Sequence, residues 1–241
     1  MELASKKTIA IMQPYIFPYI GYFNLVSSSD IFIFLDDVNY INKGWINRNY
    51  ILANGIPNRL TIPLENSSQN KKINNLRIKN YSYTKKQILN KLHHAYCKSK
   101  NYSYIITLIE NILDLKNQYI SELAIKSVTT IFEFLGIEKQ FIKSSDLPSN
   151  TKGCKGFDRL IKILALYDSK NYVNLPGGKS LYTKNEFKER GFDLSFIKPS
   201  NAIYPQLNNK GKFVPNLSII DLLMNMNVQN LKATFQSYNL E

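Results

Sequence analysis

Two short apolar runs near the N-terminus predict the first two strands of a sheet. Residues 8–12 form a β-leaning run that stops at Gln13-Pro14, because proline cannot continue a strand ladder. Residues 31–35 form a second run without polar alternation, which is typical of a strand covered on both faces. Residues 19–27 fit a short helix between them. A strand–turn–helix–strand opening of this kind is the first half of a doubly wound α/β sheet.

The rest of the chain continues with a hairpin, three helices in succession, and then alternating strands and helices. Asn54-Gly55 lies between two short runs and predicts a β-hairpin over residues 50–63, and one short strand is expected within the polar loop that follows, at 73–78. Apolar residues recur at helical spacing in several later segments. The predicted helices are 84–98, 102–115, 118–135, 157–167, 181–190, 217–226 and a last one from Val228, and the predicted strands are 140–144, 172–175 and 192–197.

These elements predict an α/β fold with a Rossmann-like, mostly parallel sheet flanked by helices, a β-hairpin and an inserted helical lobe. We expect residues 1–241 to form a single α/β domain, with 84–136 as a helical lobe inserted in or packed on the sheet. In such sheets, ligands bind beyond the carboxyl ends of the strands and against helix N-termini. Residues 13–21 and 36–48 would both lie at that edge.

The charge of the chain favours an anionic partner. The net charge is +13, and residues 50–100 hold ten Lys or Arg against one acid. A local excess of this size raises the electrostatic potential and would attract RNA, a nucleotide or a charged membrane face. The chain is also rich in Asn, Lys, Ile and Tyr, as an AT-rich genome produces, and under that interpretation the charge has no partner.

Other features bear on the compartment. No run approaches the ~20 apolar residues of a membrane span, and the N-terminal residues contain no apolar signal segment. Cys97 and Cys154 are too few and too isolated for a disulfide framework or a metal cluster. We therefore expect a cytoplasmic protein without a membrane span, and the sequence leaves open whether it uses a metal.

Four segments in this order resemble the WbqC-like family, whose members are encoded among bacterial O-antigen and other surface-polysaccharide genes. The segments are MQPYIFPYIGYF, LDDVNYINKGWINRN, YVNLPGGKSLY and FVPNLSIIDLL. The role proposed for the family is transfer of glycine, or another amino acid, onto the amino group of an unusual sugar. The resemblance therefore implies an N-aminoacyl (glycyl-like) transferase that acts on a nucleotide-linked amino sugar, with aminoacyl-tRNA or ATP as the source of the acyl group.

Two other functions remain open. The order of strand, Pro- and Gly-containing loop, helix and strand is similar to that of the nucleotidyltransferase group, where pantothenate synthetase joins a carboxylate to an amine with ATP. This chain lacks the paired histidines of that group, because Gln13-Pro14-Tyr15 and Gly21-Tyr22 stand in their place. The alternatives are thus an ATP-dependent carboxylate–amine ligase, or a non-enzymatic module that binds RNA or a sugar nucleotide through its basic segment.

Acyl transfer to a sugar amine needs a base that removes the ammonium proton. Asp37 at the end of a strand is the preferred base, with its pKa raised by partial burial, and Asp36 is a structural or metal-binding carboxylate. The alternative is that the pair only caps a turn. Asn49 or backbone N–H groups would meet the acyl oxyanion.

Aromatic and basic residues supply the candidate binding groups. If residues 43–49 are extended, Lys43, Trp45, Asn47 and Asn49 share one face, and Trp45 stacks on a base or sugar ring while Arg48 binds phosphate. The alternative is that Trp45 is a core residue and that Arg48 pairs with Asp36 or Asp37. The remaining candidates are Gln13, Tyr15, Tyr19, Gly21 and Tyr22 in the first loop, Gly177, Gly178 and Tyr182 in a strand-to-helix turn that would hold a pyrophosphate, and Tyr204 and Gln206 as polar lining.

Overall fold

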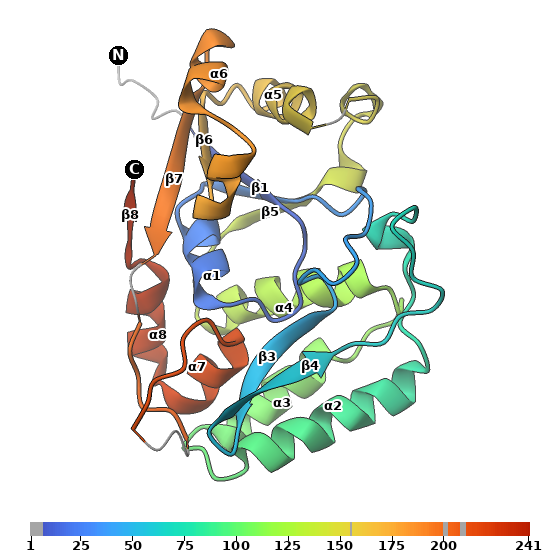
Figure 1. The fold of residues 1–241 in the computed structure, drawn as a ribbon, viewed down its shortest axis with the longest axis vertical. Helices are drawn as coiled ribbons and strands as arrows, with labels where there is room; N and C mark the ends of the chain where they lie inside the picture. The colour runs from blue at the N-terminus through green and yellow to red at the C-terminus, as the bar shows by residue number, and fades with distance from the viewer. Residues whose placement is uncertain (1–6, 155, 200–201, 208–210) are drawn as a thin grey trace.

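A computed structural model describes residues 7–154, 156–199, 202–207 and 211–241 (Figure 1). Its main sheet has six strands in the order β5-β2-β1-β6-β7-β8, all parallel except the last pair, which is antiparallel. The predicted fold class, a mostly parallel sheet flanked by helices with a separate hairpin, is therefore confirmed. The strands are β1 (Thr8–Met12), β2 (Ile31–Phe34), β5 (Gln140–Lys143), β6 (Asn171–Asn174), β7 (Asp193–Pro199) and β8 (Tyr238–Leu240).

The connections between these strands place the topological switch point of the sheet beside β1. From β1 the chain adds β2 and β5 on one side, and then β6 and β7 on the other. The carboxyl ends of β1 and β6 therefore flank the crevice where α/β sheets bind their ligands. Gln13 follows β1 directly, and Leu175 follows β6.

Alternate residues of the strands contribute to two hydrophobic cores, one on each face of the sheet. Phe32 and Phe34 of β2 belong to the larger core, whereas Ile31 and Ile33 of the same strand belong to the smaller one. This arrangement explains why β2 has no polar position. The helices are α1 (Ile20–Ser27), α4 (Ile120–Phe134), α7 (Ile219–Asn225) and α8 (Val228–Phe235), which contribute to the larger core, and α5 (Gly156–Leu166) and α6 (Lys184–Glu189), which contribute to the smaller one.

The hairpin of β3 (Arg48–Ala53) and β4 (Ile56–Thr61) forms a two-stranded sheet of its own. It packs beside α2 (Tyr81–Tyr96), which is followed by α3 (Tyr102–Ile112) (Figure 1). Asn54 and Gly55 at its turn have φ angles of 52° and 75°, as the Asn-Gly signal predicts for a two-residue turn. The hairpin was thus predictable from local turn chemistry.

Two expectations about elements differ from the structure. The strand predicted at 73–78 is a short 3₁₀ helix, η1 (Ile73–Asn75), followed by isolated bridges at Arg77 and Ile78. The sequence pattern also missed β8, which pairs with β7 only through residues 197–199. Both are short segments whose conformation depends on distant partners rather than on their own periodicity. Among the described residues, no helix has both the length and the apolar character that a membrane crossing requires.

Candidate functional site

The loop between β1 and α1 adopts a strained backbone that its neighbours hold in place. Phe17 is buried and has a φ of 40°, a left-handed conformation that bulky L-residues rarely adopt. Its N–H donates to Ser127 Oγ at 3.0 Å, and its carbonyl oxygen accepts from Asn49 Nδ2 at 2.7 Å and from Ser218 Oγ at 2.8 Å. A strained backbone of this kind is kept only where surrounding contacts hold it in place. Such strained residues are common at functional sites.

The held loop forms one wall of a cavity of about 330 Å³. Trp45 lies on this cavity with 48% of its surface exposed, which excludes the core role considered for it. A tyrosine hydroxyl is already protonated at neutral pH, and burial raises the pKa of both Tyr15 and Tyr19 further, so both hydroxyls can donate hydrogen bonds. The lining residues are Tyr15, Pro18, Tyr19, Trp45, Asn49 and Asn216.

Gly21 sets the position of one cavity wall. A Cβ at Gly21 would lie 2.4 Å from the ring of Tyr19, so the ring packs directly over the glycine. On its other side, Tyr19 lines a second cavity of about 560 Å³, which also shares Asn216 with the first. Tyr19 and Asn216 therefore border both hollows, and the predicted site residue Gly21 lines the second one and lies beneath the ring of Tyr19.

The segment that carries Trp45 is not extended, so the predicted common face of Lys43, Trp45, Asn47 and Asn49 is wrong. Residues 42–47 form turns and bends, and Lys43 has a φ of 61°. Asn47 is instead structural, because it accepts from Tyr40 Oη at 2.9 Å and donates to the Ile62 carbonyl at 2.8 Å. Turn residues rotate successive side chains away from the alternation that a strand would impose.

The side chains of Asn49 and Arg48 differ in how many of their polar groups already form hydrogen bonds. The Asn49 amide donates to the carbonyls of Phe17 and Ile16 and accepts from the Tyr50 N–H, so it holds the loop and has no donor left for an oxyanion. Arg48 uses its Nε to bind the Gly44 carbonyl at 2.9 Å. Within the described residues no ion pair engages Arg48 or the exposed Lys43.

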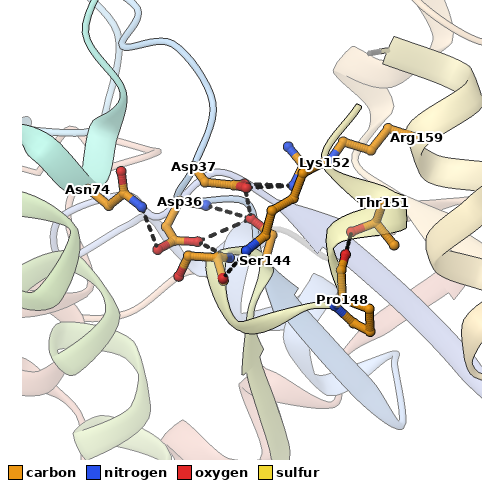
Figure 2. A network of polar contacts seen from close by, with 9 residues as sticks. Asp36, Asp37, Asn74, Ser144, Pro148, Thr151, Lys152 and Arg159 are labelled. Carbon is orange, nitrogen blue, oxygen red and sulfur yellow. Dashed lines mark hydrogen bonds and ion pairs between the residues drawn. The ribbon is translucent and has the colours of Figure 1, made fainter. Parts of the chain in front are cut away.

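Asp36 and Asp37 lie in a second cluster, at the carboxyl ends of β2 and β5 (Figure 2). Asp37 is 8% exposed, and both of its oxygens accept from Arg159 Nη2 of α5 at 2.8 Å. The hydroxyl of Ser144 donates to Asp37 and lies 3.1 Å from Asp36, whose carboxylate also accepts from the Ser145 N–H at 2.9 Å. No residue of this cluster lines the aromatic cavity.

The electrostatics of Asp37 contradict its expected role as a base with a raised pKa. Burial opposes ionisation, but the hydrogen bonds from Arg159 and Ser144 outweigh it and hold the pKa of the Asp37 carboxyl below its ordinary value. A carboxylate that is bound on both oxygens by a guanidinium is a weak proton acceptor. The buried Asp–Arg pair considered for this region exists, with Arg159 rather than Arg48 as its cation.

The cluster is also poorly suited to a metal ion. Both oxygens of Asp37 are taken by Arg159, whose charge lies where a cation would have to bind. Among the residues with described positions, no three His, Cys, Asp or Glu side chains gather as a metal site would require. The oxygens of Asp37 are thus already engaged by a cation from within the protein.

Several predicted binding residues are packing residues. Tyr22 is fully buried and donates to the Gln13 carbonyl, and Tyr182 packs against Phe157 and Phe187 in the smaller core. Gln13 itself is half-buried at the end of β1. Tyr22 and Tyr182 thus pack against other core side chains.

The strand-to-helix turn expected to hold a pyrophosphate forms a 3₁₀ helix, η4 (Pro176–Ser180). A Cβ at Gly178 would lie 2.3 Å from Asn174 Nδ2, and the Gly178 N–H already donates to the Leu175 carbonyl. Gly178 therefore serves close packing. The space around Gly177 is open, with no atom within 4 Å of where its Cβ would lie.

Tyr204 and Gln206 converge on a buried carboxylate. Tyr204 Oη and Tyr96 Oη donate to Asp221 at 2.7 and 2.8 Å, and Gln206 Nε2 donates at 3.2 Å. Ser218 caps α7 by accepting from the Ile220 N–H, while the Asp221 side chain turns inward and is buried. This network ties α7 to α2 and to the loop that lines the second cavity.

Several residues of the aromatic cavity and of the Asp36–Asp37 cluster were not predicted from the sequence. Asn216 is not among the predicted site residues, although it lies in the VPNLS segment and lines the aromatic cavity with a φ of 57°. Ser144 and Arg159 are not among them either. Asn216 could have been found from its position in FVPNLSIIDLL, the fourth segment that resembles the family, just before α7.

Comparison with known proteins identifies the family of the chain. The chain is 26% identical to the uncharacterized protein Rv1507c of Mycobacterium tuberculosis over 226 residues, which cover 92% of this chain and 95% of that protein. No solved structure matches the chain. Residues 13–233 match the WbqC-like protein family, and that match includes every residue of the aromatic cavity. The chain therefore belongs to the WbqC-like protein family.

Proposed function

We propose that this protein is an N-aminoacyl transferase that adds a glycyl-like group to the amino group of a nucleotide-linked amino sugar in bacterial surface-polysaccharide (O-antigen) synthesis. The observation that carries the proposal is the cavity between the strained first loop and Trp45. Three of the four segments that resemble the family meet there, through Tyr15 and Tyr19, Trp45 and Asn49, and Asn216.

The lining of this cavity suits a sugar ring. Aromatic faces pack against the C–H faces of a ring, while the hydroxyls of Tyr15 and Tyr19 and the amide of Asn216 supply hydrogen bonds to its polar groups. A volume of about 330 Å³ is at the small end for ligand sites, so it fits one ring rather than a whole nucleotide sugar. We assign it to the amino-sugar ring. Lys43 and Arg48, in the segment that carries Trp45, are the candidates for the phosphates.

The reaction needs no strong base. A sugar amine with a pKa near that of an α-amino group, about 8, is already partly uncharged at neutral pH. Its nitrogen attacks the acyl carbon of an aminoacyl ester, the new C–N bond forms as the C–O bond breaks, and the departing alkoxide oxygen takes the amine proton and leaves as a hydroxyl. We assign Asp36 and Asp37 a positioning role, because their hydrogen bonds fix the start of the segment that runs from β2 to Trp45.

The proposal is tested by product mass. Purified protein is mixed with a nucleotide-linked amino sugar and either glycyl-tRNA or glycine plus ATP. We expect the sugar nucleotide to gain the mass of one glycyl residue with one of these donors, and Trp45→Ala to lose most of the product. Product only with glycine plus ATP would indicate a carboxylate–amine ligase. Saturable binding without product from any donor would contradict the transferase and leave a binding module.

A further inference from the structure

A third hollow, of about 770 Å³, lies away from the aromatic cavity, between β4 of the hairpin and α2. One face of α2 lines this hollow opposite Asn58 and Arg59 of β4. The α2 residues on that face include Tyr83, Gln87, Lys91 and His94. The spacing of the α2 residues is the three- to four-residue period that places side chains on one face of a helix. We call this hollow the α2 groove, and it shares no lining residue with the aromatic cavity.

The α2 groove concentrates positive charge without a compensating acid. Arg59 and Lys91 line it, and no Asp or Glu is among the described residues that do so. Lys91 Nζ donates to the Arg59 carbonyl at 2.6 Å, which brings the ammonium group onto the strand that carries the guanidinium. Neither side chain forms an ion pair within the described part of the chain.

The two cations are crowded enough to affect each other. Burial, and then the neighbouring charge of Arg59, lower the pKa of the Lys91 ammonium. An anion bound between them would relieve this repulsion. By contrast, Lys85 on another face of α2 is already paired with Asp114 at 3.6 Å. Lys91 is therefore the α2 lysine that lines the groove without an ion pair among the described residues, while Lys86, which also has none there, lies outside the groove.

The remaining lining residues favour a nucleic acid over an acidic peptide. Tyr83 at the groove is 64% exposed and offers a flat face on which a base can stack. Asn54, Asn58, Gln87 and Asn90 offer amide groups that can both donate and accept hydrogen bonds, as base edges require. An acidic peptide would use the cations but would leave the aromatic face and most acceptors without a partner.

The geometry points to the α2 groove as a binding site for single-stranded RNA, with Arg59 and Lys91 on phosphates and Tyr83 under a base. The inference deepens the proposed function, since a transferase that uses aminoacyl-tRNA must hold the RNA that carries its acyl group. It requires only RNA binding, so it can be tested without any transfer reaction.

The test uses the full chain and a fluorescein-labelled single-stranded RNA of roughly 12 nucleotides. Fluorescence anisotropy gives the Kd over a range of salt concentrations. Each phosphate contact contributes about −0.7 to the slope of log K against log salt, so Arg59→Gln/Lys91→Gln should flatten the slope by roughly 1.4 and weaken binding at least tenfold at low salt. Tyr83→Ala should weaken binding roughly fivefold or more with the slope unchanged.

Lys184→Gln/Lys188→Gln on α6 is the matched control, because it removes the same charge from two exposed lysines at the other end of the molecule (Figure 1). We expect the control to keep the wild-type slope, and thermal unfolding to show that every variant is folded. Equal losses in the control and the groove variant, no RNA binding at low salt, or tighter binding of a polyglutamate peptide would each overturn the inference. RNA binding without acyl transfer would overturn only the proposed function, and acyl transfer from glycyl-tRNA that the groove variants leave unchanged would overturn only this inference.

Discussion

At the scale of single residues, the fate of Asp37 shows how a partner can reverse a chemical role. A carboxyl group at a buried strand end is expected to have a raised pKa when only desolvation acts on it. Here Arg159 and Ser144 both donate to it, and their effect outweighs burial. No local feature of the sequence indicates that a residue 122 positions away supplies the cation.

Removing that cation should destabilise the protein. Arg159→Met leaves Asp37 buried and without its partner, so we expect the free energy of unfolding to fall by about 3 kcal/mol. Arg190→Met is the control, because its 3.5 Å pair with Asp158 is exposed, and it should change stability by less than about 1 kcal/mol. Urea unfolding measures both. Equal effects would mean that the buried pair has no special contribution.

The lowered pKa of Asp37 also predicts a pH dependence. A carboxyl group with a lowered pKa in the folded state contributes stability that is present above its unfolded pKa of about 3.8 and is lost as the pH falls through the folded value. The stability difference between the wild type and Asp37→Asn should therefore be constant from pH 7 to about pH 5 and shrink below pH 4. Urea unfolding across this range would refute the lowered pKa if the difference shrank already between pH 7 and pH 5.

Asn216 allows ligand contact to be separated from folding. Its φ of 57° suits glycine, so Asn216→Gly should keep the free energy of unfolding within about 1 kcal/mol. Loss of its amide from the cavity should nevertheless weaken binding of a nucleotide-linked amino sugar roughly tenfold, as expected for one hydrogen bond. Asn66→Gly, an exposed residue with a φ of 45°, is the matched control, and an equal loss of affinity there would contradict the assignment.

At the scale of elements, β1 and α1 were predictable while the loop between them was not. The apolar run of residues 8–12 and the helix after Tyr19 follow from local pattern and proline chemistry. The left-handed conformation of Phe17 depends on Ser127, Asn49 and Ser218, which come from three distant elements. Tertiary contacts specify the conformation of this strained loop. Sequence patterns could therefore predict where the loop lies in the chain but not its backbone conformation.

Gly21 and Tyr19 should be energetically coupled within this element. Glycine to alanine in a helix normally stabilises by up to about 1 kcal/mol, but here the new Cβ would meet the Tyr19 ring at 2.4 Å. We expect Gly21→Ala to destabilise the wild type and to stabilise the Tyr19→Ala variant. Unfolding of the four proteins of this cycle measures the coupling. The same effect of Gly21→Ala in both backgrounds would show that the ring does not pack on the glycine.

At the scale of the whole molecule, the sheet was predictable because its signal is repeated. Alternation of strands and helices predicts parallel pairing, and apolar residues at both parities of β2 predict cover on both faces, as the two cores confirm. The site was harder, because residues expected in one crevice fall into an acid cluster and an aromatic cavity with no shared member. Sequence order gives the edge of the sheet at which loops emerge, but not the direction in which each loop then runs.

The central claim is that the cavity beside Trp45 receives the amino-sugar substrate. Trp45 is the only tryptophan of the chain, so intrinsic fluorescence reports directly on this cavity. Titration with a nucleotide-linked amino sugar should change the tryptophan emission saturably in the wild type, and the apparent affinity should fall at least tenfold in Tyr19→Ala. An unchanged emission spectrum at saturating ligand, with binding seen by calorimetry, would place the substrate elsewhere and contradict the account.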